Sequence, residues 1–198
     1  MIPDWLLPIS IGLVSLTSIV LLLNLDWRWS ITILGTQYIG VILLVSPAWE
    51  IEMAATILVA GWMAGAVLGV TMSSVSASQL QETNPGISER IFRLIAAGLI
   101  ALVVISAVPK SEAWFVQIND ASRWGGFILI GMGFLHLGLT NNPFRVTLGL
   151  LTILSGFEII YAEIESSTLV AGLLAIINLG LALVCAYLLI APTLEEAP

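Results

Sequence analysis

Long apolar runs separated by short polar segments dominate the sequence. Seven such runs cover approximately residues 5–25, 29–48, 53–75, 91–108, 124–140, 144–162 and 166–191. Each is close to the ~20 residues that a helix needs to cross the hydrocarbon core of a bilayer. The runs are continuous rather than alternating, and a backbone in lipid must satisfy its own hydrogen bonds. The pattern therefore predicts an all-α integral membrane protein with about seven transmembrane helices.

The composition excludes the soluble classes of protein. The 198 residues are 59% hydrophobic and 10% charged, against ~25% charged in a typical soluble domain. A net charge of −7 with six basic residues excludes a nucleic-acid-binding surface. One cysteine, Cys185, excludes a disulfide framework. The first run follows Asp4 with no basic segment or clear cleavage site, so we interpret it as a retained span.

The basic residues predict an orientation. With the N-terminus outside, four arginines fall in or beside the inner loops: Arg28, Arg90, Arg93 and Arg145. Lys110 and Arg123 then lie outside. The positive-inside rule favours this arrangement, with the N-terminus outside and the C-terminus inside. Arg93 and Arg145 lie near helix ends, where we expect their side chains to extend toward the membrane surface.

The two ends of the chain resemble one another. The tetrapeptide Leu-Val-Ala-Gly occurs at 58–61 and at 169–172, and Glu-Ile-Glu occurs at 50–52 and at 163–165. Residues 33–39 also parallel residues 153–159. We interpret 1–75 and 123–198 as two parallel three-helix repeats, joined by a linker, 76–122, that contains the fourth helix. The alternative is chance similarity between apolar helices.

Small residues recur at helical spacing in the third and seventh runs. Gly61, Gly65 and Gly69 are four residues apart. A similar face in the last run consists of Ala171, Ala175, Ala182 and Ala186. Small residues let helix backbones approach closely in lipid. We expect these faces to pack within the chain, with packing against a partner as the alternative.

Few polar side chains lie deep inside the predicted spans. Glu158 is the one charged residue away from a span end, and charge at membrane depth is costly. It is a candidate proton carrier, or else a hydrogen-bonded acid near the outer surface. Gln37 and Asn178 lie at the centres of their runs, where they hydrogen-bond between helices or line a hydrated path. His136, the single histidine, is a packing residue or a proton relay.

The remaining chemistry is sparse. The acid pairs Glu50/Glu52 and Glu163/Glu165 resemble cation ligands, although exposed loop acids are the simpler interpretation. A lone histidine makes no metal site. The sequence contains no phosphate-binding loop, nucleophile motif or haem motif. We therefore predict no catalytic residues, no metal and no cofactor.

The segment 142–150, Asn-Pro-Phe-Arg-Val-Thr-Leu-Gly-Leu, resembles the start of the middle helix in one family of membrane subunits. That family includes the three-helix K-type subunit of respiratory complex I, the C-type subunit of multisubunit cation/proton antiporters and the E-type membrane component of energy-converting hydrogenases. Its pattern has an inner-loop Asn, often a following Arg, and a Gly seven residues beyond the Asn, matched by Asn142, Arg145 and Gly149. Gly156 matches a second Gly of the hydrogenase component, and 178–183 is similar to the third helix. The layout is closest to the hydrogenase component.

The chain departs from that family at its acidic positions. The K-type subunits have glutamates where this chain has Leu151 and Ile176, and the hydrogenase component has an acid where this chain has Leu154. Glu158 lies two turns beyond Leu151 on roughly the same helix face. It is therefore the candidate replacement for the missing acids.

The resemblance implies a non-catalytic membrane-arm subunit of a complex I-like, energy-converting-hydrogenase-like or cation/proton antiporter assembly. It implies antiporter-like membrane subunits and redox subunits as partners, and a bacterial-type energy-coupling membrane, cytoplasmic or thylakoid, as the location. Glu158, Gln37, Asn178 and His136 are then the candidate residues of a proton path. The alternative is a self-contained small transporter or channel. A membrane enzyme is the least supported class.

Overall fold

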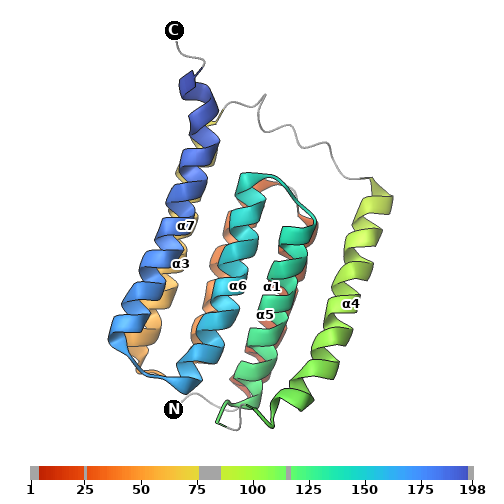
Figure 1. Ribbon diagram of the computed structural model, residues 1–198, viewed down its shortest axis with the longest axis vertical. Helices are drawn as coiled ribbons and strands as arrows, with labels where there is room; N and C mark the ends of the chain where they lie inside the picture. The colour runs from red at the N-terminus through yellow and green to blue at the C-terminus, as the bar shows by residue number, and fades with distance from the viewer. Residues whose placement is uncertain (1–4, 25, 76–85, 115–116, 196–198) are drawn as a thin grey trace.

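The computed structural model describes residues 5–24, 26–75, 86–114 and 117–195 (Figure 1). These residues form seven helices: α1 Leu6–Leu23, α2 Trp27–Val45, α3 Ile51–Ser74, α4 Ile87–Ser111, α5 Asp120–Gly138, α6 Pro143–Ile164 and α7 Thr168–Glu195. The described ranges contain no strand. The predicted all-α class and the seven predicted helical segments are confirmed.

Six of the seven helices are long and apolar enough to cross a membrane: α1, α2, α3, α4, α6 and α7. The chain is therefore a multi-pass membrane protein. The exception is α5, which contains five glycines in addition to Arg123 and His136. Three of its polar side chains turn inward, since Ser122, Arg123 and His136 are all buried. These residues lower the mean hydropathy of α5, although neighbouring helices cover them.

Several helix boundaries lie a few residues from the predicted ones, including both ends that flank residues 112–119. The polar segment from Pro109 to Arg123 was predicted to lie between helices, but α4 continues through Pro109 to Ser111. A proline so near the end of a helix removes one backbone donor from the last turn only, so its cost there is small. At the other side, α5 begins at Asp120 because the Asn119 side chain accepts a hydrogen bond from the Ala121 amide.

The helices form two layers of three, with α4 at one side (Figure 1). Each helix runs antiparallel to the one before it. The layer α1–α2–α3 lies behind the layer α5–α6–α7, so that α1 packs on α5, α2 on α6 and α3 on α7. The remaining helix, α4, contacts α5 and α1. The predicted three-helix groups thus face each other in the same order, while the residue-by-residue repeat between them stays a prediction.

Glycines bring α5 and α6 into backbone contact. A Cβ atom at Gly156 would lie 2.7 Å from the Gly126 carbonyl oxygen, and one at Gly133 would lie 2.8 Å from the Gly149 carbonyl oxygen. In each helix the two glycines are seven residues apart, so they repeat on one face. The two glycines of the family-like motif, Gly149 and Gly156, therefore serve helix packing in this chain.

The ends of α1 and α6 are held by specific polar groups. Asn142 caps α6 by accepting from the Phe144 amide, and Pro143 occupies the first turn. Arg93 and Arg145, which were expected to extend toward the membrane surface, are buried against the loop end of α1. Arg93 donates to the Leu22 carbonyl and Arg145 to the Asn24 carbonyl. They satisfy carbonyls at the C-terminus of α1, where helix geometry leaves acceptors unpaired and favours positive charge.

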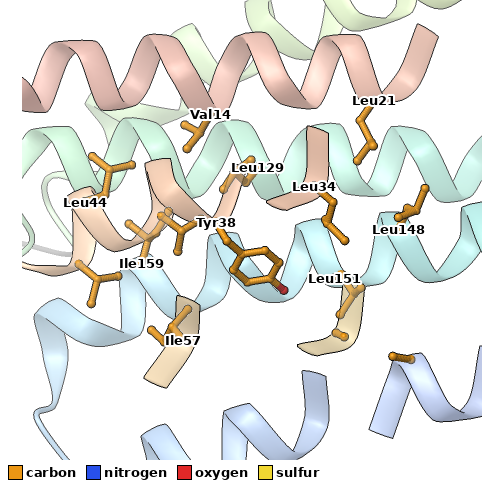
Figure 2. Close-up of a cluster of buried hydrophobic side chains, with 14 of the residues drawn as sticks. Val14, Leu21, Leu34, Tyr38, Leu44, Ile57, Leu129, Leu148, Leu151 and Ile159 are labelled. Carbon is orange, nitrogen blue, oxygen red and sulfur yellow. The ribbon is translucent and has the colours of Figure 1, made fainter. Parts of the chain in front are cut away.

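The interior is aliphatic with one aromatic side chain at its centre. Figure 2 shows Tyr38 surrounded by side chains such as Ile57, Leu129, Leu151 and Ile159, each at most 1% exposed. The Tyr38 ring lies directly against Gly61 of α3. The glycine stripe of α3 thus packs within the chain, as expected.

Candidate functional site

Five buried polar residues gather near the middle of the bundle, and we call them the central polar cluster. They come from three helices and from both layers: Gln37 and Tyr38 from α2, Thr152 and Glu158 from α6, and Asn178 from α7. Gln37, Tyr38, Glu158 and Asn178 are each 0% exposed. The cluster is therefore closed to water and to lipid in this conformation.

Glu158, Asn178 and Tyr38 form one hydrogen-bonded chain across three helices. The Tyr38 hydroxyl donates to Asn178 Oδ1 at 2.7 Å, and Asn178 Nδ2 donates to Glu158 Oε1 at 2.7 Å. Asn178 Nδ2 also lies 3.3 Å from the Leu174 carbonyl oxygen. The second carboxyl oxygen, Glu158 Oε2, has no hydrogen-bond partner among the described residues. One oxygen of the carboxyl group is thus fixed and the other is available.

Gln37 forms the second contact of the cluster. Its Nε2 lies 3.4 Å from Thr152 Oγ1, a long hydrogen bond between α2 and α6. Thr152 in turn donates to the Leu148 carbonyl of its own helix. Gln37 Oε1 is buried and has no partner among the described residues. Gln37 Oε1 and Glu158 Oε2 are thus two buried acceptor atoms without a partner among the described residues, and such atoms suit a bound proton or a water molecule.

His136 lies apart from the central polar cluster. Its Cβ atom is 3.3 Å from the position that a Cβ at Gly149 would occupy. Gly149 precedes Glu158 by nine residues on α6, which is about 13 Å along a helix axis. His136 is 3% exposed, and its Nε2 atom has no partner among the described residues. The structure joins Glu158 to Asn178 and Tyr38 and joins Gln37 to Thr152, but it does not bring His136 to either group.

The acid pairs lie at the end of the bundle where α6 meets α7. Ser122 donates to Glu163 at 2.6 Å, and the Trp49 indole donates to the Glu165 carbonyl at 3.0 Å. Glu50 and Glu52 line a cleft of about 520 Å³. Within the described ranges, no group of three or more His, Cys, Asp or Glu side chains is placed to hold a metal ion.

Tyr38 and Thr152 belong to the cluster although the sequence analysis did not single them out. Both residue types are ordinary in apolar helices, so composition gives no signal. The parallel between 33–39 and 153–159 held a clue, since it sets Tyr38 at the position that corresponds to Glu158. The contact itself depends on how three helices pack.

The chemistry available to the cluster is narrow. Glu158 is the one carboxylic acid of the cluster, and is therefore the side chain best suited to taking up and releasing a proton. Asn178 and Tyr38 orient that carboxyl group, and the surrounding aliphatic side chains exclude water. The arrangement suits the holding and release of a proton within the membrane.

Fold and site together define a multi-pass helical membrane protein with one sealed, carboxyl-containing polar cluster. No protein-family model, curated protein or solved structure matches the chain.

Proposed function

We propose that the chain is a non-catalytic membrane subunit of a larger energy-coupling assembly of the complex I-like, hydrogenase-like or cation/proton antiporter kind. In this proposal it packs beside antiporter-like subunits, links them to the rest of the membrane arm, and contributes Glu158 to a proton path. The location proposed is a bacterial-type cytoplasmic or thylakoid membrane, with the N-terminus outside and the C-terminus inside. We further propose that α5 crosses the membrane as the seventh span, and that the two layers are copies of one three-helix unit.

The observation that carries this proposal is the burial of Glu158. A carboxyl group with 0% exposure in the middle of an apolar bundle is expensive to maintain, and such residues in membrane helices mark functional sites by default. Among the described residues, one hydrogen bond from Asn178 of α7 holds the carboxyl group in place, rather than an ion pair. A proton is the ligand that such a group takes up without needing further ligands.

The sealed cluster favours a subunit over a self-contained transporter. A transporter needs a route that opens its binding site to water, whereas Gln37, Tyr38, Glu158 and Asn178 are all 0% exposed. The outer faces of α4 and α7 consist largely of exposed apolar side chains, including Leu99, Leu102, Ile176 and Leu183. Those faces suit contact with lipid or with other membrane helices.

The test begins with a tagged chain purified gently from its native membrane. We expect antiporter-like and redox subunits to co-purify with it. In vesicles that contain the assembly, E158Q should lower the rate of proton translocation by about 100-fold, the lower range for loss of a positioned proton-transfer group. The matched control is E165Q, which changes an exposed acid at the end of the same helix.

Two results would reject the proposal. One is a chain that purifies alone and by itself carries protons or cations across liposomes in a Glu158-dependent manner, which would establish the transporter alternative. The other is an assembly in which E158Q and E165Q translocate protons at the wild-type rate.

A further inference from the structure

We propose that Tyr38 and Asn178 are positioning residues for Glu158: they fix Oε1 through a directed hydrogen-bond chain and leave Oε2 as the oxygen that binds the proton. Gly61 makes this chain possible by leaving room for the Tyr38 ring. The inference rests on the proposed role of Glu158 as a proton-binding group, and it adds the residues that set the geometry of that group.

The direction of the chain follows from its acceptors. Asn178 Nδ2 lies 2.7 Å from Glu158 Oε1 and 3.3 Å from the Leu174 carbonyl oxygen. A backbone carbonyl only accepts, so the amide nitrogen must be on that side of Asn178. Asn178 Oδ1 then accepts from the Tyr38 hydroxyl at 2.7 Å. Every donor in the chain therefore points toward Glu158.

A proton on Glu158 is consequently confined to one oxygen. Oε1 faces an N–H group, and a proton placed there would meet another donor rather than an acceptor. Oε2 faces no partner among the described residues. The protonated group thus has its hydroxyl at Oε2 and its carbonyl at Oε1, with the carbonyl hydrogen-bonded to Asn178. An amide does not readily release a proton, so exchange takes place at Oε2 and not through Tyr38.

Gly61 determines whether Tyr38 reaches Asn178. A Cβ atom at Gly61 would overlap three carbons of the Tyr38 ring. The next glycines of the stripe are less restrictive, since a Cβ at Gly65 or Gly69 would meet only Ile31, at 3.6 Å and 3.4 Å. Tyr38 therefore passes across α3 at the one point of the stripe where a side chain on α3 would block it.

Infrared difference spectroscopy of the purified full chain tests this geometry directly. Subtracting the E158Q spectrum from the wild-type spectrum isolates the carboxyl C=O stretch of Glu158. Hydrogen bonding to the carbonyl oxygen lowers that frequency. We expect N178L to move the band to higher frequency, and Y38F to move it in the same direction by a smaller amount because Asn178 is then less polarised. G61A should act like Y38F because it displaces the Tyr38 ring.

Each variant has a matched control. Y187F removes a hydroxyl from an exposed tyrosine of α7, N141L changes an exposed asparagine in the loop before α6, and G172A adds a methyl group where nothing lies within 4 Å. These three should leave the band unmoved. Y38F keeps the ring and its packing, so it retains the fold even if N178L does not.

An unmoved or lowered band in correctly folded Y38F and N178L would overturn the proposal, as would equal shifts in the controls. This readout is independent of any partner subunit. A band that shifts as expected, in a chain whose assembly translocates protons normally with E158Q, would leave the geometry standing and reject the proposed function.

Discussion

Asn178 makes more hydrogen bonds within the central polar cluster than any other side chain. It accepts from Tyr38 and donates to both Glu158 and the Leu174 carbonyl. Tyr38 and Glu158 are fully buried, so water cannot replace a hydrogen bond that either of them loses. Replacing Asn178 therefore removes its hydrogen bonds and also leaves the polar groups of Tyr38 and Glu158 buried without that partner.

We expect N178L to lower the free energy of unfolding by about 1–3 kcal/mol, the cost of leaving buried polar groups unpaired. Thermal unfolding in detergent measures this loss. The control N141L, at an exposed loop position, should stay within about 0.5 kcal/mol of wild type. Equal stability of N178L and wild type would mean that the cluster contributes no net stability.

At this scale the sequence predicted the members that are chemically unusual in an apolar run. Glu158, Asn178 and Gln37 were identified because polar side chains deep in a span are rare and costly. Tyr38 could not be identified in the same way, because its apolar ring is common in membrane helices. Its hydroxyl group has a hydrogen-bond partner only because of the way the helices pack. His136 is as rare as Glu158 but belongs to a different part of the bundle.

At the scale of single helices, α5 shows how packing changes the meaning of a sequence. Its glycines lower its hydropathy, yet Gly126 and Gly133 lie against the backbone of α6. The same glycines that weaken α5 as an independent span therefore strengthen its attachment to its neighbour. The seven helical segments followed from apolar runs, while the ends near Pro109 and Asp120 depended on local hydrogen bonding that hydropathy does not register.

We expect G156A to lower the free energy of unfolding by about 1–3 kcal/mol, because its Cβ would meet the backbone of α5 rather than a movable side chain. The comparison is G98A in α4, where nothing lies within 4 Å of the added carbon. Thermal unfolding of the two variants in the same detergent distinguishes them. Similar behaviour of both would contradict a tight α5–α6 contact.

At the scale of the whole molecule, the stacking of two layers in the same order bears on the proposed repeat. Facing helices α1 and α5, α2 and α6, and α3 and α7 run in the same direction (Figure 1). Corresponding residues nevertheless meet different surroundings: Gly61 is buried under Tyr38, while Gly172 is exposed. Two like units that stack in this way must use opposite faces. The pattern of apolar residues alone does not reveal which face of a helix turns inward, because lipid and the protein interior are both apolar.

Labelling with a membrane-impermeant thiol reagent tests the number of spans and the orientation. In a Cys185→Ser background, Gln117→Cys and Ser166→Cys should react from outside, and Asn141→Cys from inside, because all three positions are exposed in loops. Reaction of Gln117→Cys and Asn141→Cys from the same side would show that α5 does not cross. Reaction of all three from the sides opposite to those expected would reverse the proposed orientation.

The modest apolarity of α5 also bears on how the chain enters the membrane during synthesis. A segment with five glycines and Arg123 gains little from lipid by itself. Its partner α6 satisfies the criteria for a span, and the two share backbone contacts at Gly126–Gly156 and Gly133–Gly149. We therefore expect α5 to wait at the insertion channel until the ribosome has made α6, so that the pair leaves the channel as a hairpin. Stable integration of the fifth helix would then depend on residues translated after it.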